Sequence, residues 1–189
     1  MNDFKHRLLE IGKGLETLHK SNVANQIEDA LNLIVPSLER RLPMLVCGNG
    51  GSAADALHIS GELVGRFLVE RKALNVISLS ANVAVMTAWA NDYAYDTIFS
   101  RQVQAHGVSG GVLFCLSTSG NSKNVLKALQ TAKQMGLSTI GLTGKGGGEM
   151  AKLCDVLIDA PSNSTPRVQE MHLIVYHYLC ERIESALAS

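Results

Sequence analysis

His58 and Glu62 stand four residues apart in a segment that has a helical pattern of apolar residues. Because residues four apart lie on one face of an α-helix, the imidazole and the carboxylate can meet there. Such a pair can share a metal ion or act in proton transfer. For an isolated pair, a solvent-exposed hydrogen bond worth a few tenths of a kcal/mol is the simpler interpretation.

A second imidazole, His177, lies in an apolar run near the C-terminus, so we expect it to be partly buried. Gln169 lies eight residues earlier in the same predicted helix, a rise of about 12 Å along the axis. For both side chains to meet one metal ion, each would have to reach toward the other, or different subunits would have to contribute. On the residues alone, this spacing makes a metal site shared by Gln169 and His177 strained.

The loop from Gly48 to Asp55 is rich in glycine and leads into a predicted helix. Glycine lets the backbone turn sharply and approach a ligand, and the N-H groups at a helix N-terminus favour an anion. The loop fits the loose dinucleotide pattern G-x-G-x-x-A, but the next strand ends in Leu79 to Asn82 without the expected acid. A nicotinamide cofactor is therefore disfavoured. A tight turn with Ser52 as helix cap fits the loop equally well, with or without a ligand.

The segment from Ser117 to Ser122 carries four hydroxyl groups in six residues, and a predicted helix follows it. Hydroxyl and backbone N-H donors at a helix start suit a phosphate monoester. A serine-rich turn with one capping hydroxyl is the alternative. No lysine stands in the Walker position, so a nucleoside triphosphate is not indicated.

The elements that must position these residues follow a β-α alternation. Strands are expected at Met44–Cys47, Asn75–Leu79, Val112–Leu116, Ser138–Leu142 and Val156–Ile158. Helices are expected at about Ser52–Val64, Val83–Ala90, Ser122–Met135, Gly148–Leu153 and Arg167–Leu187, after packing helices in the first 40 residues. This order predicts one α/β domain over residues 1–189, a three-layer, flavodoxin-like sandwich around a five-stranded parallel sheet. Ligands of such folds bind at the carboxyl ends of the strands.

Composition excludes several other classes of protein. The 189 residues are 46% hydrophobic and 18% charged, a globular balance without the long apolar run of a membrane helix. Seventeen basic residues balance 17 acidic ones, so a nucleic-acid partner is not expected. Charged residues near the N-terminus, where a signal peptide would be apolar, predict a cytoplasmic protein.

Five ordered motifs together resemble the sugar isomerase (SIS) family, and within it the phosphoheptose isomerase branch. The resemblance spans about residues 5–187 and is far more specific than any one motif. The motifs are Gly48 to Asp55, His58-x-x-x-Glu62-x-x-x-Arg66-Phe67, Ala90-Asn91-Asp92-Tyr93, Ser117 to Ser122, and Arg167 to His172. One departure is Pro166, where some members carry an aspartate.

The resemblance implies isomerisation of sedoheptulose 7-phosphate to D-glycero-D-manno-heptose 7-phosphate through an enediol, the first step of bacterial ADP-heptose or GDP-heptose biosynthesis. It implies Glu62 and His177 as the acid/base pair and a zinc ion, one per subunit, held by His58, Glu62, Gln169 and His177. It further implies a homotetramer with active sites at subunit interfaces. The implied substrate-binding residues are Asn49, Gly50, Gly51, Ser52, Glu62, Asn91, Asp92, Ser117, Thr118, Ser119, Ser122 and Gln169.

A rival within the same family is a non-catalytic tetramer that binds the bacterial replication initiator protein and keeps the glycine and serine loops. It lacks the carboxylate and the imidazole at the positions that match Glu62 and His177. A binding protein has no physical need for these two groups at a sugar, so their joint presence here favours catalysis.

Overall fold

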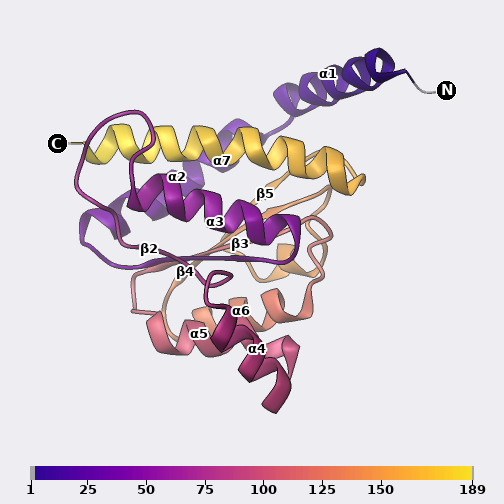
Figure 1. Ribbon diagram of the computed structural model, residues 1–189. Helices are drawn as coiled ribbons and strands as arrows, with labels where there is room; N and C mark the ends of the chain where they lie inside the picture. The colour runs from indigo at the N-terminus through magenta and orange to yellow at the C-terminus, as the bar shows by residue number, and fades with distance from the viewer. Residues whose placement is uncertain (1–2, 189) are drawn as a thin grey trace.

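A five-stranded parallel sheet lies at the centre of the computed structural model, which describes residues 3–188 (Figure 1). Met1, Asn2 and Ser189, which the predicted domain span includes, lie outside the described residues. The strands are β1 (Met44–Gly48), β2 (Val76–Ser78), β3 (Val112–Ser117), β4 (Ser138–Thr143) and β5 (Val156–Asp159), in the order β2-β1-β3-β4-β5. The predicted fold class is confirmed, and no predicted strand differs from the observed one by more than one residue at either end.

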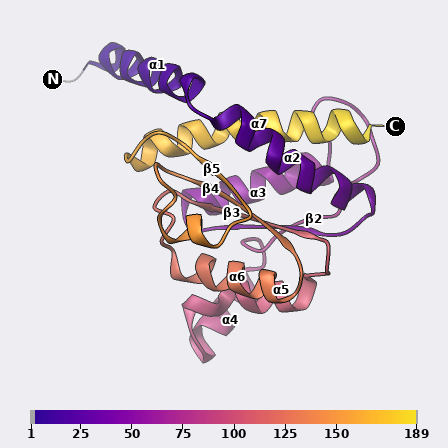
Figure 2. The ribbon, with the colours of Figure 1, turned by 180° about the vertical axis from the view of Figure 1, so that it is seen from behind.

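Helices cover both faces of the sheet because the side chains of each strand point alternately to one face and the other. Met44 and Val46 of β1 pack with the helices α2 (Val23–Glu39), α3 (Gly51–Val64) and α7 (Thr165–Leu187). Leu45 and Cys47 face the opposite layer, formed by α5 (Ile98–His106) and α6 (Lys123–Gln134), with α4 (Val83–Asp92) beyond it (Figures 1 and 2). The result is the three-layer sandwich that the alternation predicts.

Helix α5 has no counterpart among the predicted helices. Ile98, Phe99 and Val103 are its buried apolar residues, but Gln102 occupies a core position beside them. The Gln102 amide nitrogen donates hydrogen bonds to the carbonyl oxygens of Leu79, at 2.9 Å, and Ile98, at 3.1 Å. A polar residue therefore interrupts the apolar pattern from which the other helices were predicted.

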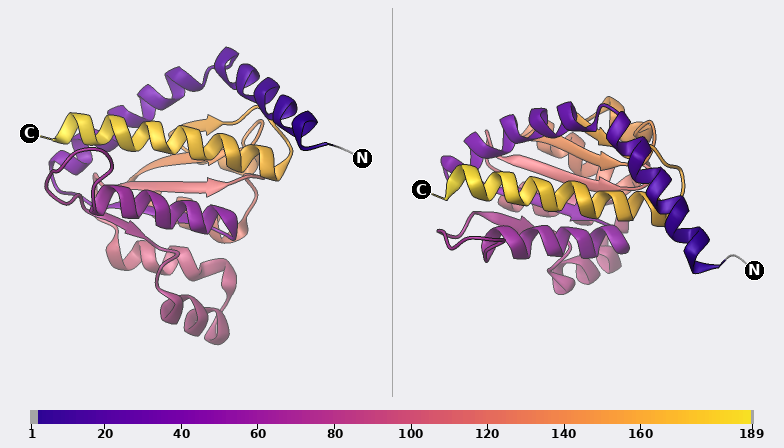
Figure 3. Two further views of the ribbon diagram at one scale, coloured as in Figure 1. Left: turned by 45° about the horizontal axis from the view of Figure 1, so that its top comes forward. Right: turned by 90° about the horizontal axis from the view of Figure 1, so that it is seen from above.

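Helix α1 (Phe4–Lys20) extends away from the rest of the chain (Figures 1 and 3). Its C-terminal part is anchored, since Leu18 is buried and Leu15 packs against the same small cluster as Met171. At its other end Leu8 and Leu9 are exposed. The predicted packing stripe of this helix is thus only partly covered within one chain.

Buried Glu184, near the end of α7, fixes the segment that follows α3. Its carboxylate accepts hydrogen bonds from the backbone N-H groups of Phe67, Leu68 and Val69 at 2.6 to 3.0 Å. The buried Arg71 guanidinium lies 3.4 Å from the same carboxylate.

None of the helices within residues 3–188 has both the length and the apolar composition needed to span a bilayer.

Candidate active site

A hollow of about 290 Å³ lies at the carboxyl ends of β1 and β3, where the fold predicts ligand binding. The starts of α3, α6 and α7 also meet there, so three helix N-termini surround it. The lining residues are Asn49, Gly51, Ser52, Leu116, Ser117, Thr118, Ser119, Ser122, Thr165 and Gln169. Eight of them are among the substrate-binding residues that the sequence resemblance implies.

The hydroxyl-bearing loop after β3 turns tightly at Gly120. The Gly120 N-H donates to the Ser117 carbonyl at 3.0 Å, and its φ of +65° lies in the left-handed region. A side chain there would also collide with the Gly147 backbone. The turn brings the hydroxyl oxygens of Ser117 and Ser122 to 3.0 Å from each other at the start of α6. Hydroxyl groups and helix N-H groups thus gather as a phosphate monoester requires.

The glycine loop after β1 lets the start of α7 approach the start of α3. Gly50, with φ +56°, turns the chain into α3. A Cβ on Gly51 would collide with the side-chain amide of Gln169, so a larger residue there would displace that amide. The loop therefore places a helix N-terminus and the Gln169 amide beside the hydroxyl-bearing loop.

Two helices bring His58, Glu62 and His177 into one cluster. On α3, His58 Nε2 lies 2.9 Å from Glu62 Oε1, as the four-residue spacing predicts. His177 comes from α7, and its ring meets the ring of His58 edge-on with the centroids 5.0 Å apart. The ring of Phe67 also lies near His177, tilted, with 5.7 Å between the ring centroids. An imidazole and a carboxylate in such proximity can move protons to and from a bound sugar.

Tyr176 adds a polar contact that the sequence analysis did not find. Its hydroxyl oxygen lies 3.0 Å from His58 Nδ1 and 3.4 Å from Asp55 Oδ1. Burial raises the pKa of Tyr176, and the neighbouring Asp55 carboxylate raises it further. Burial also raises the pKa of Asp55. Tyr176 stands in an apolar run, which is typical of a core residue, and its position next to His177 is the one signal in the sequence that could have indicated a role at the site.

The donor atoms of the cluster are of the types that zinc binds, although their arrangement here does not form a complete site. His177 Nε2 is buried and makes no hydrogen bond within residues 3–188, which leaves one imidazole nitrogen free for a ligand. Imidazole nitrogens and a carboxylate are ordinary zinc ligands. Gln169, however, lies two helical turns away at the hydroxyl-bearing loop. Within residues 3–188, no three His, Cys, Asp or Glu side chains lie close enough together to bind one metal ion.

Asn91 and Asp92 do not line the hollow. Both are exposed near the end of α4, where the Asn91 side-chain amide donates to Asp92 Oδ1 at 3.0 Å. Their predicted contact with substrate stays a prediction.

His172 is a buried core residue rather than a part of the cluster. Its Nε2 donates to the Thr143 carbonyl oxygen at 3.1 Å. Burial lowers the pKa of His172 to about 4, so the ring is neutral near pH 7.

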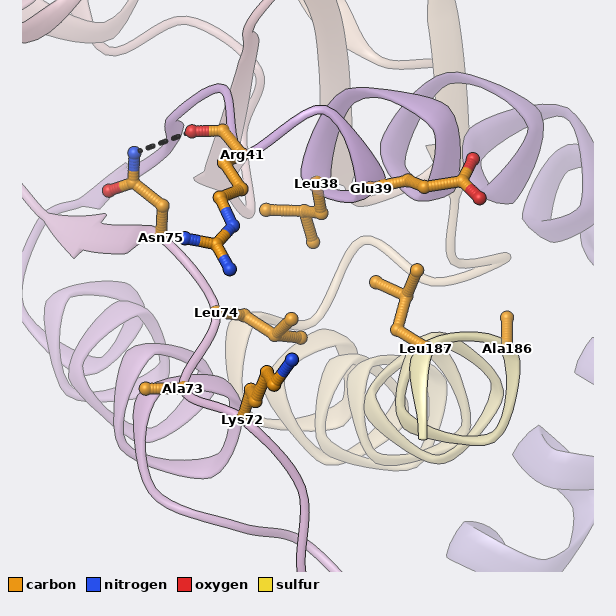
Figure 4. Close-up of a pocket in the computed structure, with 9 residues that line it drawn as sticks. All are labelled: Leu38, Glu39, Arg41, Lys72, Ala73, Leu74, Asn75, Ala186 and Leu187. Atoms are coloured by element: carbon orange, nitrogen blue, oxygen red, sulfur yellow. Dashed lines mark hydrogen bonds between the residues drawn. The ribbon is translucent and has the colours of Figure 1, made fainter. Parts of the chain in front are cut away.

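A larger hollow, about 640 Å³, lies at the amino ends of β1 and β2 (Figure 4). Leu38, Leu74 and Leu187 contribute apolar side chains to it, with Arg41 and Lys72 at its rim. It contains none of the hydroxyl-bearing or imidazole side chains described above. The hydroxyl-bearing loop lines the smaller hollow, so we assign phosphate binding to that one; His58, Glu62 and His177 line neither hollow.

Comparison with known proteins identifies the family of the chain. The family model for the SIS domain matches residues 10–144. A phosphoheptose isomerase of Rhodospirillum rubrum is 52% identical over 166 residues, which cover 88% of each chain. The solved phosphoheptose isomerase of Neisseria gonorrhoeae superposes with a TM-score of 0.90 at 36% identity, covering 96% of this chain and 97% of that one. For the phosphoheptose isomerase of Francisella tularensis the TM-score is 0.92 at 31% identity, covering 96% of each chain.

The chain therefore belongs to the SIS domain family, a class defined by this sheet and by the ligand loops at its carboxyl edge. Within that class it is a member of the phosphoheptose isomerase branch.

Proposed function

We propose that this chain isomerises sedoheptulose 7-phosphate to D-glycero-D-manno-heptose 7-phosphate, the first step toward bacterial nucleotide-activated heptose. The observation that carries the proposal is the placement of His58, Glu62 and His177 in one cluster, in a chain that also carries a hydroxyl-bearing loop suited to phosphate. Membership of the phosphoheptose isomerase branch supports the same reaction. We also propose that the reaction takes place in the cytoplasm.

The phosphate group binds in the hollow at the start of α6. Ser117, Thr118, Ser119 and Ser122 offer hydroxyl donors there, and the first N-H groups of the helix add positive potential. Hydrogen bonds to a charged acceptor are stronger than neutral ones, so this loop supplies much of the affinity. Asn49, Gly50, Gly51, Ser52 and Gln169 hold the sugar next to it, with Asn91 and Asp92 as further contacts.

The reaction needs one group to move a carbon-bound proton and another to move oxygen-bound protons. Glu62 removes a proton from C1 of the open-chain ketose, which leaves an enediol between C1 and C2. His177 transfers the hydroxyl protons, so that the carbonyl moves from C2 to C1. Glu62 then returns a proton to C2, and the aldose is complete with no net gain or loss of atoms.

His58, Glu62, Gln169 and His177 would hold zinc, one ion per subunit. When bound, zinc polarises the carbonyl oxygen and stabilises the negative charge of the enediolate. A carboxylate cannot be a tight metal ligand and a free base at the same time. Glu62 therefore either moves between the two roles, or the metal mainly organises the site.

A homotetramer with active sites at subunit interfaces would bring further residues to each site. Exposed apolar side chains on the site-bearing helices support assembly: Leu57 and Val64 on α3, and Leu173, Ile174 and Tyr178 on α7, are all at least 39% exposed. Apolar patches of this kind mark subunit contacts.

The non-catalytic alternative, binding of the replication initiator, finds less support. The family member with that role lacks the carboxylate and the imidazole, whereas here Glu62 and His177 both contact His58. Because both groups contact His58, the carboxylate and the imidazole lie close together, an arrangement that a protein-binding surface does not need.

The decisive experiment is turnover of sedoheptulose 7-phosphate by the purified chain, measured with and without added zinc and in deuterated solvent. We expect heptose 7-phosphate product and solvent deuterium at C2, where the enediol route returns a proton. Glu62→Gln is the matched control for active-site chemistry. Absence of turnover with and without zinc, together with binding to a replication initiator, would establish the alternative instead.

A further inference from the structure

Two side chains outside the implied substrate-binding set hold the amide of Asn49. The Tyr95 hydroxyl, on the 3-10 helix η1 (Tyr95–Thr97), donates to Asn49 Oδ1 at 2.8 Å. Asn124, at the start of α6, donates to the same oxygen at 2.9 Å and accepts from Asn49 Nδ2 at 2.9 Å. Three hydrogen bonds from two elements therefore converge on one side chain that lines the hollow.

The backbone fixes which way this network points. The Val125 N-H donates to Asn124 Oδ1 at 3.0 Å, and a backbone N-H can only donate. The Asn124 oxygen must therefore face Val125, and its amide nitrogen must face Asn49. Because Asn124 is buried, with 2% of its surface exposed, water does not compete for the hydrogen bonds of its side-chain amide. Asn49 is consequently held with its oxygen toward Asn124 Nδ2 and Tyr95.

This arrangement leaves the Asn49 side chain with a single free hydrogen-bonding group. Its oxygen already accepts two hydrogen bonds, one for each lone pair, and one of its two amide hydrogens is given to Asn124. The remaining group is one N-H donor. A sugar phosphate can therefore present only an acceptor oxygen to this side chain.

Tyr95 is itself well anchored for this role. The Trp89 indole N-H of α4 donates to Thr97 Oγ1 at 2.8 Å, which ties η1 to α4. The Tyr95 side chain is 52% exposed, so its ring contributes little to the core. The hydrogen bond to Asn49 is the contact that links η1 to the glycine loop.

We propose that Tyr95 and Asn124 are positioning residues, which hold the Asn49 amide as a donor toward an acceptor oxygen of the substrate. The inference rests on the proposed function, because it assigns the oxygen to a bound sugar phosphate. Neither residue touches the substrate; both act through Asn49.

Tyr95→Phe tests the proposal, with Tyr93→Phe as the matched control. Tyr93 lies two residues earlier and is 70% exposed, and its ring stacks on Trp89 with the centroids 4.1 Å apart. Its hydroxyl makes no hydrogen bond in the described part of the chain. For sedoheptulose 7-phosphate we expect Tyr95→Phe to raise KM about 3- to 10-fold, as for the loss of one hydrogen bond, with kcat little changed. Tyr93→Phe should keep both constants.

A double-mutant cycle with Asn49→Ala identifies the path of the effect. If Tyr95 acts through Asn49, then Tyr95→Phe causes no additional rise in KM once Asn49 is alanine. Melting temperatures show that each variant is folded, and Asn49→Ser replaces Asn49→Ala in the cycle if the alanine variant does not fold.

Two results would overturn the inference: a Tyr95→Phe enzyme that matches Tyr93→Phe, or an equal loss from Tyr95→Phe with and without the Asn49 side chain. Both require an active wild type. A wild-type protein without turnover would instead refute the proposed function, so the two failures are distinguishable.

Discussion

The ring of His177 meets the ring of His58 edge-on, with 5.0 Å between their centroids, although the two residues lie on different helices. The contact joins α7 to α3 at the point where Glu62 accepts a hydrogen bond from His58. Packing of two helices against one face of the sheet thus creates a cluster of two imidazoles and a carboxylate that neither helix contains alone.

The first prediction concerns the acid/base pair. Glu62→Gln and His177→Ala should each lower kcat about a hundredfold or more, the scale of general acid/base catalysis. Because both groups act on one transition state, the double variant should lose much less than the product of the two single losses. Steady-state kinetics measure this. Near-normal turnover and deuterium exchange in Glu62→Gln would show that another group is the base.

Stability separates this role from a structural one. Glu62 and the His58 ring that it contacts are both partly exposed, so the Glu62→Gln melting temperature should stay close to wild type. A large drop in melting temperature with a proportionate activity loss would indicate a structural role.

Ser119→Ala should weaken sugar-phosphate binding without harming the fold. Ser119 is exposed, and its hydroxyl accepts one hydrogen bond from the Asn121 N-H at 3.2 Å. Loss of a donor to a charged acceptor corresponds to about 1.5 to 3 kcal/mol, which is a KM increase of roughly 10- to 150-fold. Titration calorimetry and steady-state kinetics check this. Unchanged KM and kcat would place the phosphate elsewhere.

The sheet could be predicted because buried parallel strands appear as short apolar runs that end in Gly, Ser or Asn. Helix α5 could not be predicted in the same way, since Gln102 satisfies its amide inside the core and breaks the apolar periodicity. The sequence pattern does not show that a polar side chain such as Gln102 is buried with its hydrogen bonds satisfied; only the tertiary structure shows this.

The candidate site was predictable where its geometry is local. The four-residue spacing of His58 and Glu62 fixes their contact within one helix, and the hydroxyl-bearing loop is one continuous segment. The approach of His177 to His58 depends instead on how α7 packs on α3. Tyr176 and Tyr95 were missed for the same reason, because their hydrogen-bond partners lie far along the chain.

The assembled protein should sediment at about four times the chain mass of 20.3 kDa. Leu9, on the exposed side of α1, is 67% exposed, so we expect it to be covered in the tetramer. Leu9→Glu should then shift the protein to smaller species and lower its activity, whereas Lys13→Glu, at a polar exposed position of the same helix, should not. Analytical ultracentrifugation measures both. A monomer with full activity would contradict active sites shared between subunits.

The last prediction is that His172 lowers the free energy of unfolding of the protein in acid. Burial lowers the pKa of His172 to about 4 in the folded chain, whereas in the unfolded chain it lies near the ordinary value of 6.5. As the pH falls through 6.5, His172 is protonated in the unfolded state, whereas in the folded state it stays neutral down to about pH 4. The stability contribution is therefore complete above pH 6.5 and is lost toward pH 4, by about 3 kcal/mol.

Replacement of His172 isolates this contribution from that of the carboxylates, which also titrate in acid. A His172→Gln variant keeps an amide donor for the Thr143 carbonyl but has no proton to gain. Urea unfolding at several pH values from 7 to 4 gives the free energy of unfolding of both proteins. We expect the wild type to lose more stability than the variant over this interval, because only the wild type has the buried imidazole. Parallel pH profiles would mean that His172 is protonated in the folded chain near its ordinary pKa, and that burial does not keep the ring neutral.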